Sequence, residues 1–330
     1  MYFGLSDEAT ALRDGLRDVL STACTPLTIR AAWDGSACEL LWKELGAFGL
    51  PGLMVSEDRG GLGLDALAMV AALEEAGWHG VPGPLVETVA YLPGLDLPVD
   101  GSVRIAVQRP GQRLVPYAGV ATHVFREDDL SLLTSFTTAP LESVDRSRRL
   151  ASVEGTGSFD PSRLRYVSEE QHAAAGGVRP THPSSLATLG TAAFLLGLAR
   201  RQVDLTIAYV KERKQFGVPV GSFQAIKHPL ADAVVGTEFA WPAVLRAAHS
   251  LVTEDAEADA HVSMAKALAS DAAYQVSRVC LQAHGAMGYT VEYDLHLFAK
   301  RTWALTKDWG TASQHRSRIA AHLGMEGTAS

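Results

Sequence analysis

Two segments of the chain combine the end of a helix with polar side chains and small residues. The first, Glu212–Gly217 (ERKQFG), ends a long helical pattern and is followed, after a Gly/Pro turn, by Phe223–Ile226 (FQAI). The second, Leu281–Thr290 (LQAHGAMGYT), places small residues directly after another helical pattern, where a ligand can approach the backbone closely. Both segments are therefore candidate ligand contacts. Taken alone, Arg213 would be interpreted as a solvated cation that satisfies the carbonyls of the last helical turn.

Together the two segments resemble the acyl-CoA dehydrogenase family. The resemblance extends to Gly60–Gly63 with its flanking helical patterns and to Gly310, Thr311 and Arg316 near the end of the sequence. It implies a mainly α fold with a small β domain: an N-terminal helical domain, a reduced middle β domain and a C-terminal four-helix bundle. It also implies FAD as the cofactor and a dimer in which the bundle of one subunit lies against the flavin of its neighbour.

The positions that match the family's cofactor contacts are Arg213, Gln215, Phe216, Gln224, Gln282, Gly285 and Ala286. The resemblance implies that Arg213 meets the FAD pyrophosphate, a role that suits the fixed, forked donors of a guanidinium. It further implies that Phe216 packs on the cofactor. Gln282 and the small residues after it would accommodate the adenosine half.

The sequence departs from the family at the position of the catalytic base. Family members oxidise an acyl-CoA across its α and β carbons: a carboxylate removes the α-proton while a hydride passes to the flavin. The base usually lies in a Tyr-Glu-Gly-Thr pattern, whereas the matching run here is Asp308-Trp309-Gly310-Thr311. Because an indole nitrogen only donates hydrogen bonds, Trp309 cannot accept the proton. No catalytic residue is therefore assigned.

Other positions for a base are poor candidates. Some family members carry it on the first helix of the C-terminal bundle, and an ungapped count places that position and the Arg after it at Ala187 and Thr188, neither of which is a strong base. Asp308 stands one residue out of register, and its shorter side chain should point elsewhere. The alternatives for Asp308 are a relocated base or a surface carboxylate.

A second loss concerns the middle domain. The family's loop of Thr-Glu-Pro-Gly-x-Gly-Ser-Asp type, which holds the isoalloxazine ring and the substrate, has no counterpart between Val99 and Gly177. The chain thus keeps the contacts made across the dimer interface and lacks those made within one subunit. This pattern resembles the non-catalytic subunit of actinobacterial heterotetrameric acyl-CoA dehydrogenases. The resemblance implies a catalytic paralogue as partner, which binds most of the acyl-CoA, and bulky substrates such as steroid side-chain CoA thioesters.

Two other functions stay open. The chain could be a self-sufficient homomeric dehydrogenase, or a lyase-like relative, that uses Asp308 or another base. It could also be a flavin-free scaffold subunit that keeps only the oligomer interface. His284 and His315 are possible acid/base groups, but a single histidine without an assignable carboxylate partner is more often structural.

The periodicity of apolar residues and the positions of Gly and Pro indicate which elements position these residues. Helical patterns occupy 5–95, β-rich segments broken by Gly, Pro and Asp occupy about 100–176, and long helical patterns return from Pro183. The predicted bundle helices run from Ser184 or Ser185 to about Arg213, from about 224 to 251, from about 255 to 284 and from about 312 to 323. The predicted domains are 1–98, 99–177 and 178–330. This order predicts packed helical and β parts rather than a doubly wound sheet.

Composition excludes several classes of protein. A formal net charge of −8, with no run of basic residues, excludes a nucleic-acid surface. The N-terminus lacks the features of a signal peptide and no apolar stretch could span a membrane, so a cytoplasmic location is expected. The three cysteines, Cys24, Cys38 and Cys280, are too few and too scattered for a disulfide framework or a metal site and are expected to be core thiols.

Overall fold

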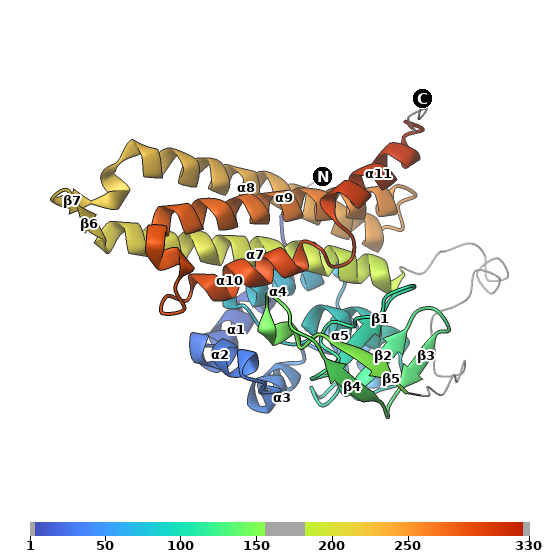
Figure 1. Ribbon diagram of the computed structural model, residues 1–330. Coiled ribbons are helices and arrows are strands. Elements are labelled where there is room, and N and C mark those ends of the chain that lie inside the picture. Colours follow the sequence, from blue (N-terminus) through green and yellow to red (C-terminus); the bar gives the residue numbers. More distant parts are fainter. Residues whose placement is uncertain (1–3, 156–181, 326–330) are drawn as a thin grey trace. The chain divides into compact units, whose positions relative to one another are not determined.

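The computed structural model describes residues 4–155 and 182–325, which fall into two compact units (Figure 1). One unit holds the described parts of Met1–Asp7, Leu73–Gly80 and Thr188–Ser330, and the other holds those of Glu8–Ala72 and Val81–Ala187. The chain is mainly helical with a few short strands, which confirms the predicted fold class. The three-domain division stays a prediction, and in the structure the strands share one unit with the N-terminal helices.

The first part of the chain is helical because apolar residues recur at helical spacing. In order along the chain, the elements are α1 (Asp7–Ala23), α2 (Pro26–Trp33), α3 (Glu39–Phe48), the 3-10 turn η1 (Glu57–Arg59), α4 (Ala66–His79), α5 (Leu85–Tyr91) and η2 (Leu92–Gly94). Leu16 and Leu20, one helical turn apart on α1, are fully buried and belong to one apolar face of the helix.

Five short strands follow in the same unit. They are β1 (Ile105–Gln108), β2 (His123–Arg126), β3 (Ser131–Leu133), β4 (Thr137–Pro140) and β5 (Ala151–Glu154), with η3 (Arg146–Arg148) before β5. β1 pairs with β2 in parallel, β2 with β3 antiparallel, and β4 with β5 antiparallel. The backbone N–H of Ile105 donates to Thr88 Oγ1 at 3.0 Å, so the first strand is tied to α5. All five strands lie in the segment of about 100–176 where the sequence predicts β structure.

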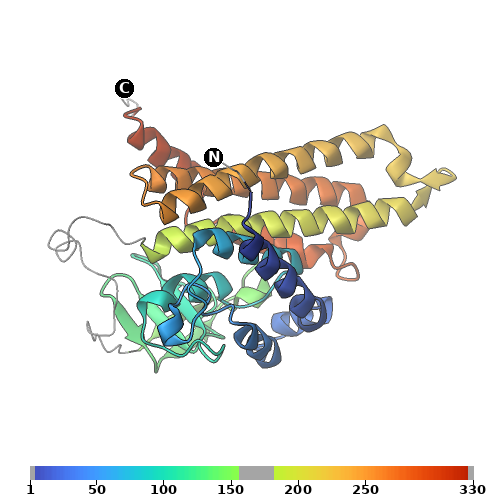
Figure 2. The ribbon, with the colours of Figure 1, turned by 180° about the vertical axis from the view of Figure 1, so that it is seen from behind.

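The other unit is a helical bundle. Its long helices are α7 (Pro183–Glu212), α8 (Gln224–Val252) and α9 (Ala258–His284), followed by α10 (Leu295–Leu305) and α11 (Ala312–His322). The connections hold β6 (Lys214–Gln215), β7 (Val218–Pro219), η5 (Val220–Ser222) and η6 (Gly285–Tyr289). Figures 1 and 2 show α7, α8 and α9 lying along one another, with the β6–β7 hairpin projecting beyond one end. The predicted start of this helix at Ser184 or Ser185 is one or two residues late, because α7 begins at Pro183.

A pair of glycines brings α7 close to the C-terminal half of α4. A Cβ at Gly197 would lie 1.9 Å from the backbone oxygen of Glu74, and a Cβ at Gly77 would lie 2.2 Å from that of Phe194. Backbone therefore packs on backbone at this crossing, which leaves no room for a side chain. Beside it, Trp78 Nε1 donates to Asp204 Oδ2 at 2.7 Å, so polar contacts reinforce the crossing.

The cysteine prediction was correct for two residues and wrong for the third. Cys24 and Cys280 are buried, and burial raises the pKa of the Cys280 thiol to about 11, as expected of a core thiol. Cys38 is only half-buried, because it occupies the left-handed position that precedes α3. Among the described helices, none is both long enough and apolar enough to cross a membrane.

Candidate functional site

The β6–β7 hairpin carries the first group of predicted contact residues. Its two-residue turn consists of Phe216 and Gly217, both with positive φ (54° and 82°), as the tightest antiparallel hairpins require. The backbone N–H of Val220 donates to the carbonyl of Arg213 at 2.8 Å and closes the loop. A phenylalanine in this left-handed position is strained, and residues held in such conformations cluster at functional sites.

The predicted contacts on this hairpin all face solvent. Phe216 is 92% exposed, and its ring meets the edge of Phe223 with centroids 6.3 Å apart. Arg213, Gln215 and Gln224 are also exposed. Within residues 4–155 and 182–325, no hydrogen bond or ion pair engages these three side chains, so a guanidinium and two amides stand available beside an aromatic ring.

The second group lies at the C-terminal end of α9. Gln282, Gly285 and Ala286 are exposed, and Gly285 has φ 57°. A side chain added at Gly285 would meet no atom within 4 Å, so the space beside this backbone is open. Figures 1 and 2 show η6 and the hairpin at the same end of the bundle.

An aromatic cluster joins the two groups. Tyr209, one turn before Arg213, stacks on His284 with ring centroids 4.3 Å apart and an angle of 17° between the planes. Its hydroxyl lies 3.4 Å from the carbonyl oxygen of His284, and Tyr293 closes the cluster at 4.8 Å from the His284 ring. The last turn of α7 is thereby fixed to the last turn of α9. Sequence reasoning missed the roles of Tyr209 and Tyr293, for which no motif gave a signal.

His284 is structural in this geometry. Its Nδ1 lies 2.8 Å from the carbonyl oxygen of Cys280, which only accepts, so Nδ1 carries the hydrogen. Burial lowers the pKa of His284, although its hydrogen bond to Cys280 opposes that shift. The neutral ring therefore serves as a packing element of the cluster, as the sequence reading favoured.

A cavity of about 430 Å³ opens between the end of α7 and the start of α8. Its walls are mostly aliphatic, from Ile207, Val210, Ile226 and Leu230, with Lys211 and Lys227 among the lining residues. This volume lies within the range of small-molecule sites. An apolar cavity with two lysines in its lining fits a ligand that combines apolar groups with phosphates.

Position 309, where the sequence analysis expects the base of the family, lies elsewhere in the bundle, in the loop between α10 and α11. Trp309 is 6% exposed, with φ 56°, and Asp308 is 5% exposed. The interpretation of Asp308 as a surface carboxylate was therefore wrong, because the preceding turn carries its side chain into the protein. Ala187 and Thr188 are both buried, and neither offers a proton acceptor strong enough for this chemistry.

The two parts of the site are far apart. Lys266, which contacts the Trp309 loop, and Gln282 are sixteen residues apart on the single helix α9, a distance of about 24 Å at 1.5 Å per residue. One molecule of this chain therefore does not bring the predicted flavin contacts of its hairpin end to its own position 309. The ring-holding loop sought between Val99 and Gly177 falls partly at 156–177, outside the described residues.

The chain combines N-terminal helices with a C-terminal helical bundle that carries both motif segments, and comparison with known protein families identifies its class. The family model for the acyl-CoA dehydrogenase N-terminal domain matches residues 6–92, and the model for the C-terminal domain matches residues 186–324. The chain belongs to the acyl-CoA dehydrogenase family. Members of this family are FAD-dependent flavoproteins, so FAD is the cofactor of this class.

Individual proteins and solved structures are similar to the chain over nearly its whole length. Acyl-CoA dehydrogenase IpdE2 of Mycolicibacterium smegmatis is 29% identical, over 97% of this chain and 100% of that protein. The solved structure of a Tcur3481–Tcur3483 steroid ACAD variant is 25% identical, with a TM-score of 0.76 over 98% of this chain and 99% of that one. The ChsE4–ChsE5 complex of Mycobacterium tuberculosis shares the fold, at 22% identity and a TM-score of 0.81, with 100% of both chains covered.

Proposed function

We propose that this chain is the non-catalytic subunit of a heteromeric FAD-dependent acyl-CoA dehydrogenase. Its hairpin end contributes Arg213, Phe216 and Gln282 to a flavin whose ring and catalytic base belong to a paralogous partner. The observation that carries the proposal is the contrast between two parts of the bundle: available donors and an exposed aromatic ring beside the hairpin, and a buried indole at position 309, where a proton acceptor is expected. The chain alone would be inactive.

Each contributed group has a physical role. Bound FAD accepts the hydride of α,β-desaturation. The forked guanidinium of Arg213 holds phosphate oxygens, and its available donors need not break an internal contact to do so. The exposed ring of Phe216 offers an apolar face, and the small residues Gly285 and Ala286 let the nucleotide approach the backbone.

The class of substrate is also part of the proposal. A steroid ACAD and a heteromeric mycobacterial complex are among the similar structures, so we infer a bulky acyl-CoA such as a steroid-derived thioester. The partner holds most of that substrate in a heterotetramer. A cytoplasmic location stays a prediction from the sequence.

The proposal is tested by purifying the chain alone and together with a paralogue encoded next to it. We expect the lone chain to be colourless and inactive, and the complex to contain one flavin per pair of unlike subunits. Absorbance at flavin wavelengths and the protein ratio give this stoichiometry. A yellow, active preparation of the lone chain would contradict the proposal and favour a self-sufficient dehydrogenase.

Arg213→Ala in the co-expressed complex should weaken FAD binding about 10- to 100-fold, because a charge-assisted contact to phosphate is worth about 1.5 to 3 kcal/mol. Flavin retention during dilution, followed by fluorescence, measures this change. Lys214→Ala is the matched control, since it removes the same charge from the adjacent exposed residue. Unchanged flavin affinity in Arg213→Ala would instead support a flavin-free scaffold.

Asp308→Asn distinguishes a catalytic base in the partner subunit from a relocated base at Asp308 in this chain. The neutral amide keeps the shape of the side chain but cannot take up a proton at neutral pH. We expect turnover by the complex to stay within about twofold of the wild type, because general-base catalysis by a partner residue is unaffected. A loss of two or more orders of magnitude in kcat, with the complex still assembled, would place the base in this chain.

A further inference from the structure

The loop between α10 and α11 holds a strained residue in a buried setting. Trp309 has φ 56° and Gly310 has φ 105°, so two consecutive residues adopt left-handed backbone conformations. A bulky side chain rarely occupies that region, and it persists there only when surrounding groups fix the backbone. The structure shows which groups do so.

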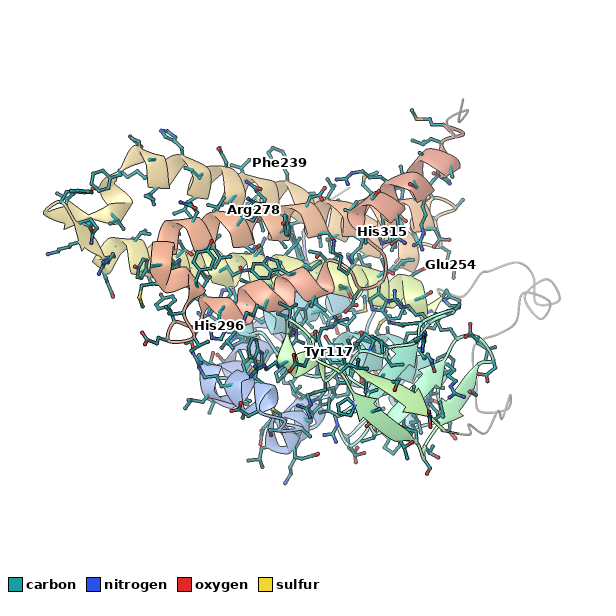
Figure 3. All side chains as sticks on the ribbon, viewed as in Figure 1. Tyr117, Phe239, Glu254, Arg278, His296 and His315 are labelled. Atoms are coloured by element: carbon teal, nitrogen blue, oxygen red, sulfur yellow. The ribbon has the colours of Figure 1, made fainter. Side chains whose placement is uncertain are left out.

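His315 fixes the loop from α11. Its Nε2 lies 2.9 Å from the carbonyl oxygen of Trp309, which only accepts, so Nε2 carries the hydrogen and donates it. The same ring lies against Gly310, where an added Cβ would approach Nε2 to 2.7 Å. His315 has no exposed surface and stands at the start of α11 beside the loop (Figure 3). It therefore holds one carbonyl and occupies the space of a side chain at 310.

Lys266 fixes the loop from α9. Its ammonium nitrogen donates to the carbonyl of Gly310 at 3.2 Å and to the carbonyl of Leu305 at 3.4 Å, and to Ser270 Oγ at 2.9 Å. Lys266 is fully buried. The two carbonyls belong to the end of α10 and to the residue before the cap of α11, so one cation holds both sides of the loop.

The end of the loop is closed by the cap of α11. The N–H of Gln314 donates to Thr311 Oγ1 at 3.2 Å, and the N–H of Thr311 donates to Gln314 Oε1 at 2.8 Å. Contacts to the backbone of the loop thus come from Lys266 on α9 and from His315 on α11.

We infer that Lys266 and His315 are positioning residues that set the backbone at position 309 independently of the side chain found there. The loop is a preformed holder, and the loss of the proton acceptor is a change of one side chain rather than a loss of the loop. Trp309 and a carboxylate are interchangeable on this backbone. All of these contacts lie within this chain, so they do not depend on the proposed partner or on bound flavin.

Hydrogen exchange of the purified chain, resolved to peptides that cover 303–316, tests this inference. Lys266→Met should speed exchange in the loop about tenfold while the peptides of α8 keep their rates. Trp309→Glu should leave loop exchange within about threefold of the wild type, and the double variant should behave like Lys266→Met. Met264→Leu, an exposed change two residues earlier on α9, is the control.

The outcomes separate positioning from general stability. The inference would be overturned if Lys266→Met speeds exchange in every peptide of the unit, or leaves the exchange rate of the loop unchanged. It would also be overturned if Trp309→Glu speeds exchange in the loop more than threefold. If Lys266→Met does not fold, Ser270→Ala and His315→Leu each remove one contact of the holder, and loop exchange at least threefold faster in both is then the required result. Flavin content and turnover of a complex play no part in this readout.

Discussion

Gly197→Ala is expected to destabilise the chain by about 3 kcal/mol, because its methyl group has no space. The added Cβ would lie 1.9 Å from the carbonyl oxygen of Glu74 and 2.6 Å from the backbone nitrogen of Trp78. Both obstacles are backbone atoms, so no side-chain rotation relieves the contact. The two helices must separate, which also loosens the facing contact of Gly77 with Phe194. Urea denaturation followed by circular dichroism measures the loss.

Gly236→Ala provides the control within the same bundle. Gly236 also lies inside a long helix, α8, but a Cβ there would meet nothing within 4 Å. Alanine is the better helix former, so this variant should gain about 0.5 to 1 kcal/mol. Similar effects of the two substitutions would show that helix propensity, rather than the close crossing of α4 and α7, determines the response.

The second large effect is a loss of stability in mild acid caused by His315. Burial, with the nearby charges of Lys266 and Arg318, lowers the pKa of His315 from 6.5 to about 4 in the folded chain. Between these values the unfolded chain binds the proton and the folded chain does not, so the free energy of unfolding falls as pH drops. The contribution is fully present above pH 6.5 and declines by about 3 kcal/mol toward pH 4.

The measurement compares the wild type with His315→Gln by chemical denaturation from pH 7.5 to 4.5. The amide can still donate to the carbonyl of Trp309 but does not titrate in this range. Burial also lowers the pKa of His123, His261 and His284, so only the difference between the two profiles reports His315. Parallel profiles for the two proteins would contradict the assignment.

The long bundle helices could be predicted from the sequence because their apolar periodicity is strong and Gly or Pro marks their ends. The expected span of about 224–251 is α8 (Gln224–Val252). The shorter helix α10 was not predicted. Even His296 and Arg301 are buried on this helix, so it shows little polar face from which periodicity can be recognised.

The candidate site was predictable only where a motif is continuous in the sequence. Arg213 and Gln282 were chosen from local patterns, and the structure places their segments at one end of the bundle. The contact that joins those segments links Tyr209 to His284, 75 residues later, and such a pairing leaves no local trace. The holder around Trp309 is similar, since Lys266 is 44 residues from Gly310.

The projecting hairpin belongs to an exposed apolar surface, which affects how a newly made chain behaves in a cell. Phe216 at its tip is almost fully exposed, and Val218, Tyr289 and Val291 are exposed too. Figure 1 shows η6, which ends at Tyr289, at the same end of the bundle as the hairpin. Apolar surface of this kind promotes aggregation and capture by chaperones when it stays uncovered. Under the proposed function a partner subunit covers this surface, so newly made chains in excess of that partner should be cleared by quality control, and synthesis of the two polypeptides in matched amounts would limit this loss.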